Sequence, residues 1–179
     1  MSKEKLMPKL RFDGFKQNKW KEAELGNIAN LSSSKRVHQS DYVEYGIPFF
    51  RGSEISKLGN SSKLKDVFYI SKELFNELKI KHGVPKIGDI LITAVGTLGN
   101  SYLISNDIPF YFKDGNLIWL SDISIESEYL SIYLSSEIGR KKVLDSAVGS
   151  NQKALTMVKL QNVNIFFPDK EEQNKIGSF

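Results

Sequence analysis

Residues 88–104 constrain the fold more than any other segment of this chain. A Gly-Asp pair leads into the run Ile90-Leu91-Ile92, and a short run of branched apolar residues is typical of a buried strand. Gly96 and Gly99 then bracket a tight turn before a second apolar run at 102–104. Two short strands joined by a glycine-containing turn predict a β-hairpin.

The clearest helix signal follows Ser71. Serine is a favoured N-cap residue, and Leu74, Phe75 and Leu78 then fall on one helical face. Gly83 is placed where a helix commonly ends. The sequence therefore predicts a helix between this serine and this glycine.

Weaker patterns fill in the rest of the chain, where short apolar or aromatic runs predict strands and helical spacing predicts helices. The predicted strands are 49–51, 67–70, 110–112 and 117–120; the predicted helical stretches are a turn near 20–24, a helix at 129–134 and one from 138 that ends at Gly149. The polar segment 30–40 is predicted to be an exposed loop. Strands dominate the middle and helices the end, so we expect an α+β fold.

Composition limits the possible functions. The 179 residues fit one domain with a sizeable core, and the absence of cysteine excludes disulfides and thiolate metal sites. Apolar runs are too short to cross a membrane and the start lacks the apolar block of a signal peptide, so a cytoplasmic location is expected. The net charge of +4 permits a polyanionic partner without requiring one.

Catalytic patterns were sought and none was assigned. The chain lacks the Pro-Pro pair of amino-methyltransferase loops and the Gly-x-x-x-x-Gly-Lys-Ser/Thr sequence of phosphate-binding loops. Glu77-Leu78-Lys79, downstream of Asp66, loosely matches a metal-dependent nuclease pattern. On the predicted helix, however, Glu77 and Lys79 would point about 200° apart, which favours solvated surface. With only His38 and His82 available, no metal site is expected either.

Four separated signatures carry the strongest functional indication. They are Trp20 with Leu25-Gly26, IPFFRGSEI at 47–55, GDILITAVGTLG at 88–99, and GSNQKAL at 149–155 followed by FFPDKEEQNKI at 166–176. In this order and spacing they resemble the target recognition domain of the specificity (S) subunit of type I restriction-modification enzymes. The resemblance extends from about residue 10 to residue 176.

The resemblance implies a curved, mixed or antiparallel sheet with flanking helices and no catalysis by this chain. Such a module reads one half of a bipartite double-stranded DNA target and directs methyltransferase and restriction (translocase) subunits to it. S-adenosylmethionine, ATP and Mg²⁺ would be cofactors of those partner subunits, and this chain would bind none.

The resemblance also divides the chain. We expect a flexible N-terminal segment at 1–18, anchored only through Leu10 and Phe12, and a recognition domain at 19–168. In S subunits a Glu-Gln-x-x-Ile run begins a long helix that separates two recognition domains and docks the methyltransferase. Here 169–179 would be the truncated start of that helix, so the chain would be an isolated domain or a natural half-subunit.

Four polar loops supply the side chains that DNA reading needs, namely cations for phosphates and forked groups for base edges. The predicted DNA-binding residues are Lys35, Arg36, His38, Arg51, Ser53, Lys113, Asn116, Asn151, Gln152 and Lys153. Arg51 is the preferred single contact, although it could instead pair with Glu54. For Gln152, too, the sequence allows two roles: it could hold its own loop or contact the DNA backbone. Segments 33–45, 57–66 and 105–116 are the candidates for base choice.

Two other functions stay open on the sequence alone. One is a small metal-dependent nuclease that uses Glu77. The other is a protein-interaction or inhibitor module, because each basic cluster taken singly, including Arg140-Lys141-Lys142, reads as a solvated face.

Overall fold

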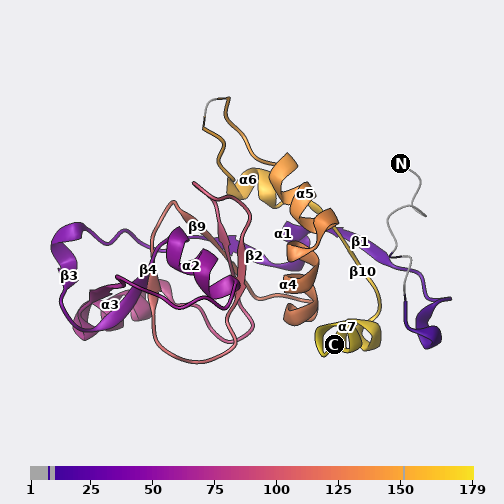
Figure 1. The fold of residues 1–179 in the computed structure, drawn as a ribbon, viewed down its shortest axis with the longest axis horizontal. Helices are drawn as coiled ribbons and strands as arrows, with labels where there is room; N and C mark the ends of the chain where they lie inside the picture. The colour runs from indigo at the N-terminus through magenta and orange to yellow at the C-terminus, as the bar shows by residue number, and fades with distance from the viewer. Residues whose placement is uncertain (1–7, 9–10, 151) are drawn as a thin grey trace.

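A computed structural model of the chain describes residue 8 and residues 11–150 and 152–179. The molecule is elongated, with β3 and α3 at one end of the long axis and the described N-terminal segment before β1, with α7 beside it, toward the other (Figure 1). The strands are β1 (Lys21–Glu24), β2 (Asn30–Ser32), β3 (Tyr42–Val43), β4 (Ile47–Phe50), β5 (Phe68–Ile70), β6 (Ile90–Thr93), β7 (Ser101–Leu103), β8 (Tyr111–Phe112), β9 (Leu117–Ser121) and β10 (Asn164–Phe167). The α-helices are α1 (Leu25–Ile28), α2 (Gly52–Gly59), α3 (Lys72–His82), α4 (Ser127–Ser135), α5 (Glu137–Asp145), α6 (Met157–Leu160) and α7 (Lys170–Gly177).

The predicted hairpin is confirmed and forms the centre of the molecule. β6 and β7 pair antiparallel, with Ile90 opposite Leu103, and β9 pairs with the other edge of β6. The full sheet has the order β2-β9-β6-β7. Gly96 and Gly99 adopt φ of 79° and 73°, the left-handed region that favours glycine, which explains why they occupy this turn.

Successive residues of the central sheet face opposite layers of core. Ile90 and Ile92 are buried in the cluster formed with α4, α5 and β10, whereas Leu91 is buried in the cluster that includes Ile55 of α2. All four residues of β6 are buried. Burial on both faces accounts for a run of apolar residues without polar alternation.

A second four-stranded sheet, β3-β5-β4-β8, supports α3. Its strands are antiparallel except for β4 and β8, which are parallel, so the sheet is mixed as expected. The helix prediction is confirmed: the Ser71 hydroxyl accepts a hydrogen bond from the Leu74 N–H at 3.1 Å, and Gly83 caps the other end with φ of 75°. Phe75 and Leu78 of α3 are buried against this sheet.

Three local predictions are wrong. Residues 21–24 form strand β1 and not a helical turn, because they pair with β10 at the far end of the chain. Within the predicted loop 30–40, residues 30–32 form the edge strand β2 beside β9, and Val37 is buried. Helix α5 ends at Asp145, four residues before Gly149.

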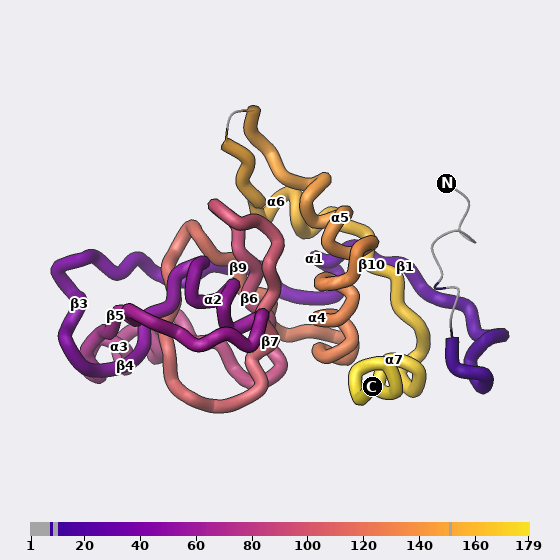
Figure 2. Tube along the Cα trace, in the orientation of Figure 1, coloured from indigo at the N-terminus to yellow at the C-terminus, as the bar shows by residue number. Residues whose placement is uncertain are grey.

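The segment 11–18 lies beside α7 at the same end of the molecule (Figure 2). The ring of Phe12 packs edge-on against that of Phe179, with centroids 6.1 Å apart. No helix in the described part of the chain is long and apolar enough to cross a membrane.

Candidate nucleic-acid interface

Residues 33–36 form a loop that is fixed to the β8–β9 region by side-chain hydrogen bonds. The Ser34 hydroxyl donates to the Phe112 carbonyl at 2.6 Å, and the Ser33 hydroxyl donates to the Leu117 carbonyl at 3.2 Å. The Tyr111 hydroxyl accepts from the Lys35 N–H at 2.9 Å. Burial raises the pKa of Tyr111, so this hydroxyl stays neutral at physiological pH. The predicted cations of this loop therefore stand on a defined backbone.

The loop 113–116 lies against the loop 33–36 and brings further charges to it. Arg36 Nε lies 3.0 Å from Asp114 Oδ2, and Lys113 Nζ lies 3.6 Å from Asp114 Oδ1. The side chain of Arg36 is 70% exposed and that of Asp114 only 14%. Two of the predicted DNA-binding cations thus share one largely buried carboxylate.

Arg51 is held by Glu54, which is the structural alternative considered for it. Its Nε and Nη2 donate to the two carboxylate oxygens at 3.0 and 2.8 Å, and its backbone N–H donates to the same group. Burial alone would raise the pKa of Glu54, but the hydrogen bonds from Arg51 and from the Ser53 hydroxyl outweigh it and lower that pKa to about 2. The guanidinium also lies over the Phe68 ring, 4.4 Å from its centroid.

The fourth predicted loop projects from the molecule between α5 and α6, at the top of Figure 1. Val148 and Ala154 close it with a pair of 2.9 Å backbone hydrogen bonds. Gly149 has φ of 110°, and a Cβ there would lie 2.4 Å from the Gln152 carbonyl, so only glycine fits. The side chains of Gln152 and Lys153 are exposed, whereas the predicted Asn151 lies outside the described residues.

Backbone hydrogen bonds join these loops into one surface. Lys113 N–H donates to the carbonyl of Phe50, the residue before Arg51, at 2.8 Å. Ala94 N–H donates to the Asn116 carbonyl at 2.8 Å, and its own carbonyl accepts from Leu155 N–H at 2.9 Å. We call this surface the recognition edge, and define it as the loops 33–36, 94–99 and 113–116, the described residues of the loop 148–155, and residues 51–54 at the start of α2.

Two basic residues of the clusters noted in the sequence, His38 and Arg140, do not add free side chains to the recognition edge. His38 is exposed but belongs to the segment leading to β3, where its N–H donates to the Asp41 carboxylate at 2.8 Å. Arg140 of α5 holds the β6–β7 turn, donating to the Leu98 and Gly99 carbonyls at 3.2 and 3.1 Å. The turn at Gly96 and Gly99 was predicted, but its support by Arg140 and its place at this surface were not, since nothing local in the sequence links the two segments.

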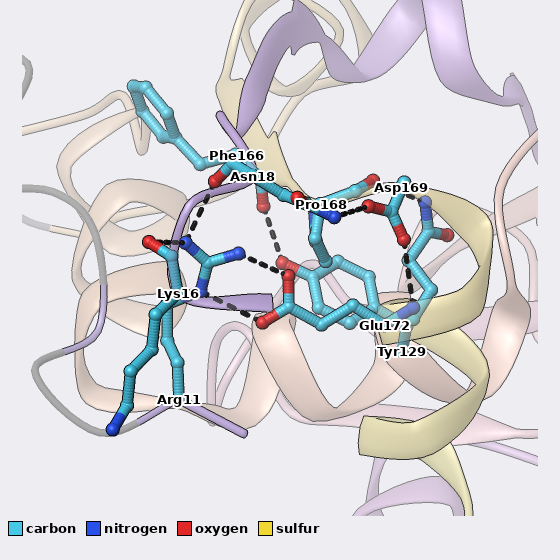
Figure 3. A network of polar contacts seen from close by, with 9 residues as sticks. Arg11, Lys16, Asn18, Tyr129, Phe166, Pro168, Asp169 and Glu172 are labelled. Atoms are coloured by element: carbon cyan, nitrogen blue, oxygen red, sulfur yellow. Dashed lines mark hydrogen bonds and ion pairs between the residues drawn. The ribbon is translucent and has the colours of Figure 1, made fainter. Parts of the chain in front are cut away.

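A separate polar network joins the two ends of the described chain (Figure 3). Arg11 Nε and Nη2 donate to Glu172 Oε1 and Oε2 at 2.9 and 2.6 Å, and both side chains are buried. Asn18 Nδ2 donates to Asp169 Oδ2 at 2.6 Å, while Oδ1 of the same carboxylate caps α7 by accepting from Glu172 N–H. Arg11 is an anchor that the sequence analysis did not identify.

Gln173, the last residue of the Glu-Glu-Gln run, completes this network. Its amide nitrogen donates to the Pro168 carbonyl at 2.8 Å, and its amide oxygen accepts from the Glu126 N–H at 2.9 Å. The run therefore docks the start of α7 onto α4.

The family that this framework indicates is matched directly. The sequence model of the family described as the type I restriction modification DNA specificity domain matches residues 17–179. The chain belongs to this family. The Trp20, Arg51, Gly88-Asp89 and Glu-Gln features noted in the sequence all lie inside the matched range.

Two relatives resemble this specificity domain over most of its length. It is 34% identical over 158 residues to a putative type I restriction enzyme specificity subunit, S.HindORF215P, from Haemophilus influenzae, covering 87% of this chain and 38% of that protein. It is 27% identical over 185 residues to the EcoBI specificity subunit from Escherichia coli, covering 97% of this chain and 37% of that protein. The chain thus spans well under half the length of both relatives.

Solved structures confirm the fold. The S subunit of a type I restriction-modification system from M. genitalium aligns with a TM-score of 0.66 at 18% identity, over 97% of this chain and 40% of the other. The HsdS subunit from Thermoanaerobacter tengcongensis aligns with a TM-score of 0.59 at 23% identity, over 89% and 35%. A chain from a study of the assembly of the type I system aligns with a TM-score of 0.61 at 22% identity, over 89% and 36%.

Neither alternative function is supported. In the specificity domain Glu77 lies on α3 and pairs with Lys81 at 2.7 Å, so it does not share an ion site with Lys79. Residues 8, 11–150 and 152–179 contain no group of three or more His, Asp or Glu side chains that could hold a metal. The relatives are specificity subunits, not nucleases or inhibitors.

Proposed function

We propose that the recognition edge binds double-stranded DNA and reads one half of a bipartite target. The observation that carries the proposal is the convergence of loops that lie far apart in sequence on one surface that holds Lys35, Arg36, Arg51, Lys113 and Lys153. Membership of a DNA specificity family supports it.

Four of these five cations would divide between two tasks. Lys35 and Lys153 are exposed, and exposed lysines suit phosphates, which they contact as point charges. Arg36 and Arg51 carry planar forks, which suit guanine edges. The amides of Asn116 and Gln152 add donors and acceptors for adenine. Arg51 would act from a pre-set orientation, since Glu54 fixes its side chain.

The assembly role follows the family. We propose that this domain directs methyltransferase and restriction subunits to the target while making or breaking no bond itself. S-adenosylmethionine, ATP and Mg²⁺ would be bound by those partners. The E. coli relative is the specificity subunit of a type I restriction enzyme, and one aligned structure comes from work on the assembly of such a complex.

Fluorescence anisotropy with labelled duplex DNA tests the proposal. Binding of a mixed-sequence duplex is measured across a series of salt concentrations. About four phosphate contacts predict a slope of log affinity against log salt of about −3 to −4. A flat response, or no binding up to high protein concentration at low salt, would contradict DNA recognition by this edge.

Lysine variants locate the binding surface. Lys35→Gln and Lys153→Gln should each make the slope shallower by about 0.9, because each removes one phosphate contact. Lys79→Gln is the matched control: Lys79 is exposed on α3, which lies away from the projecting α5–α6 loop in Figure 1. Equal effects of all three variants would place the contact surface elsewhere.

A further inference from the structure

Asp114 holds an unusual position within the recognition edge. Its Oδ2 is 3.0 Å from Arg36 Nε, and its Oδ1 is 3.6 Å from Lys113 Nζ. Oδ1 is fully covered yet has no hydrogen-bond partner in the described part of the chain. An acidic side chain is thus placed between two cations on a surface proposed to bind a polyanion.

Fold stability does not explain this arrangement. The loop 33–36 is already fixed by Ser33, Ser34 and the Tyr111 hydroxyl, none of which needs the carboxylate. The Arg36 side chain is 70% exposed, and water and salt screen such a pair, so it contributes little to folding. Leaving one carboxylate oxygen covered without a donor even opposes folding.

Electrostatic competition with DNA gives the carboxylate a role. A cation contributes to non-specific affinity when it takes the place of a counterion at any phosphate. A cation already paired with a protein carboxylate gains less from that exchange, because it must give up its partner. The same pairing fixes the direction of the guanidinium fork, which a base-edge contact requires.

We propose that Asp114 is a specificity-determining residue that withholds Arg36 from non-specific phosphate contact. Arg36 is held by the carboxylate in complexes with non-cognate DNA and is used only where a matching base or phosphate replaces that bond. The inference rests on the proposed function, since it assumes that the recognition edge binds DNA.

The salt dependence of binding to a non-cognate duplex tests the inference. Asp114→Asn removes the charge and keeps the shape, so Arg36 becomes free for one more phosphate. We expect the slope of log affinity against log salt to become steeper by about 0.9, with tighter binding at low salt. An unchanged slope overturns the inference.

Arg36→Gln separates this mechanism from a general effect of charge. In the wild-type background it should leave the non-cognate slope nearly unchanged, because Arg36 is not engaged. In the Asp114→Asn background it should abolish the added 0.9 or so. Because Arg36 is exposed, Arg36→Gln should fold normally, and its salt slope tests the inference even if Asp114→Asn proves unstable. A slope that falls by about 0.9 on Arg36→Gln alone shows that Arg36 already contacts phosphate and contradicts the inference.

A control variant and a selection complete the test. Asp122→Asn makes the same change in net charge at an exposed residue beyond the other end of β9, and should leave the slope unchanged. Selection from a randomised duplex library should give a weaker sequence preference for Asp114→Asn than for wild type. Wild-type protein without salt-dependent binding would refute the proposed function itself, whereas normal wild-type binding with equal preferences refutes only the role of Asp114.

Discussion

Arg11 and Glu172, 161 positions apart, form a two-point ion pair with side chains 7% and 1% exposed. The pair fixes the described N-terminal segment to the first turn of α7. Because Asp169 caps the same turn and accepts from Asn18, the segment and the helix are held by two adjacent carboxylates. The start of the C-terminal helix is therefore part of this domain's own packing (Figure 3).

Breaking this pair should destabilise the domain. Glu172→Gln removes the carboxylate that pairs with the buried Arg11 guanidinium and leaves only the neighbouring Asp169 charge, so we expect a loss of about 2 kcal/mol in the free energy of unfolding. Urea denaturation followed by circular dichroism measures it. Replacing both residues by methionine should recover much of the loss, because no unpaired charge then remains. A Glu172→Gln protein within about 0.5 kcal/mol of wild type would show that the pair is not structurally important.

Local patterns predicted the elements whose partners lie close in sequence. The β6–β7 hairpin and α3 were both predicted, because the glycines of the hairpin turn and the two cap residues of the helix lie directly beside the segments they join or end. β1 was missed because its partner β10 is over a hundred residues away and its own sequence, Lys-Glu-Ala-Glu, favours helix. These residues form a strand because they pair with β10, and a local stretch of sequence does not show that partner.

For the candidate site, the polar segments could be predicted from the sequence, but the contacts between them could not. The four polar segments were predicted from their residue types, and all four contribute to the recognition edge. The sequence left open whether Arg51 pairs with Glu54 three residues later, and that spacing permits the observed hydrogen bond from the Arg51 N–H to the Glu54 carboxylate. Asp114 was not singled out, because its value depends on the neighbouring loop that supplies Arg36.

The Glu54 carboxylate should make stability depend on pH in the acid range. Its folded-state pKa of about 2 lies below the ordinary value of 4.5, so above pH 4.5 or so the stabilisation is complete. Between about pH 4.5 and 2 the unfolded chain takes up a proton that the folded chain does not, and stability falls. The shift corresponds to about 3 kcal/mol.

Glu54→Gln isolates this contribution. The variant should be less stable than wild type at pH 6, and the difference should shrink as the pH falls to about 2.5. Urea denaturation at several pH values, on both proteins, removes the effect of the other carboxylates by subtraction. Two curves that stay parallel over the whole range would mean that Glu54 does not titrate differently in the folded state.

Two neighbouring tyrosines of α4 should respond oppositely to removal of their hydroxyls. The buried Tyr129 hydroxyl donates to the Phe166 carbonyl at 2.6 Å, so Tyr129→Phe should cost about 1–2 kcal/mol. The Tyr133 hydroxyl is buried close to the Phe166 backbone, but the geometry there does not make a well-formed hydrogen bond. Tyr133→Phe should therefore be neutral or stabilising. Thermal unfolding compares them, and a larger loss for Tyr133→Phe would reverse this assignment.

Gly149 and Gly96 provide a matched test of whether the shape of the projecting loop matters for DNA binding. Both have positive φ, at 110° and 79°, so alanine is strained at either position. A Cβ at Gly149 would also lie 2.4 Å from the Gln152 carbonyl, whereas at Gly96 no atom of the described structure lies within 4 Å. Gly96→Ala should cost about 1 kcal/mol and keep the turn, because strain is its only penalty. Gly149→Ala must move the backbone that carries Gln152 and Lys153, so we expect weaker duplex binding with the core intact. Anisotropy titrations beside thermal unfolding separate the two effects, and equal duplex affinity for wild type and Gly149→Ala would remove this loop from the interface.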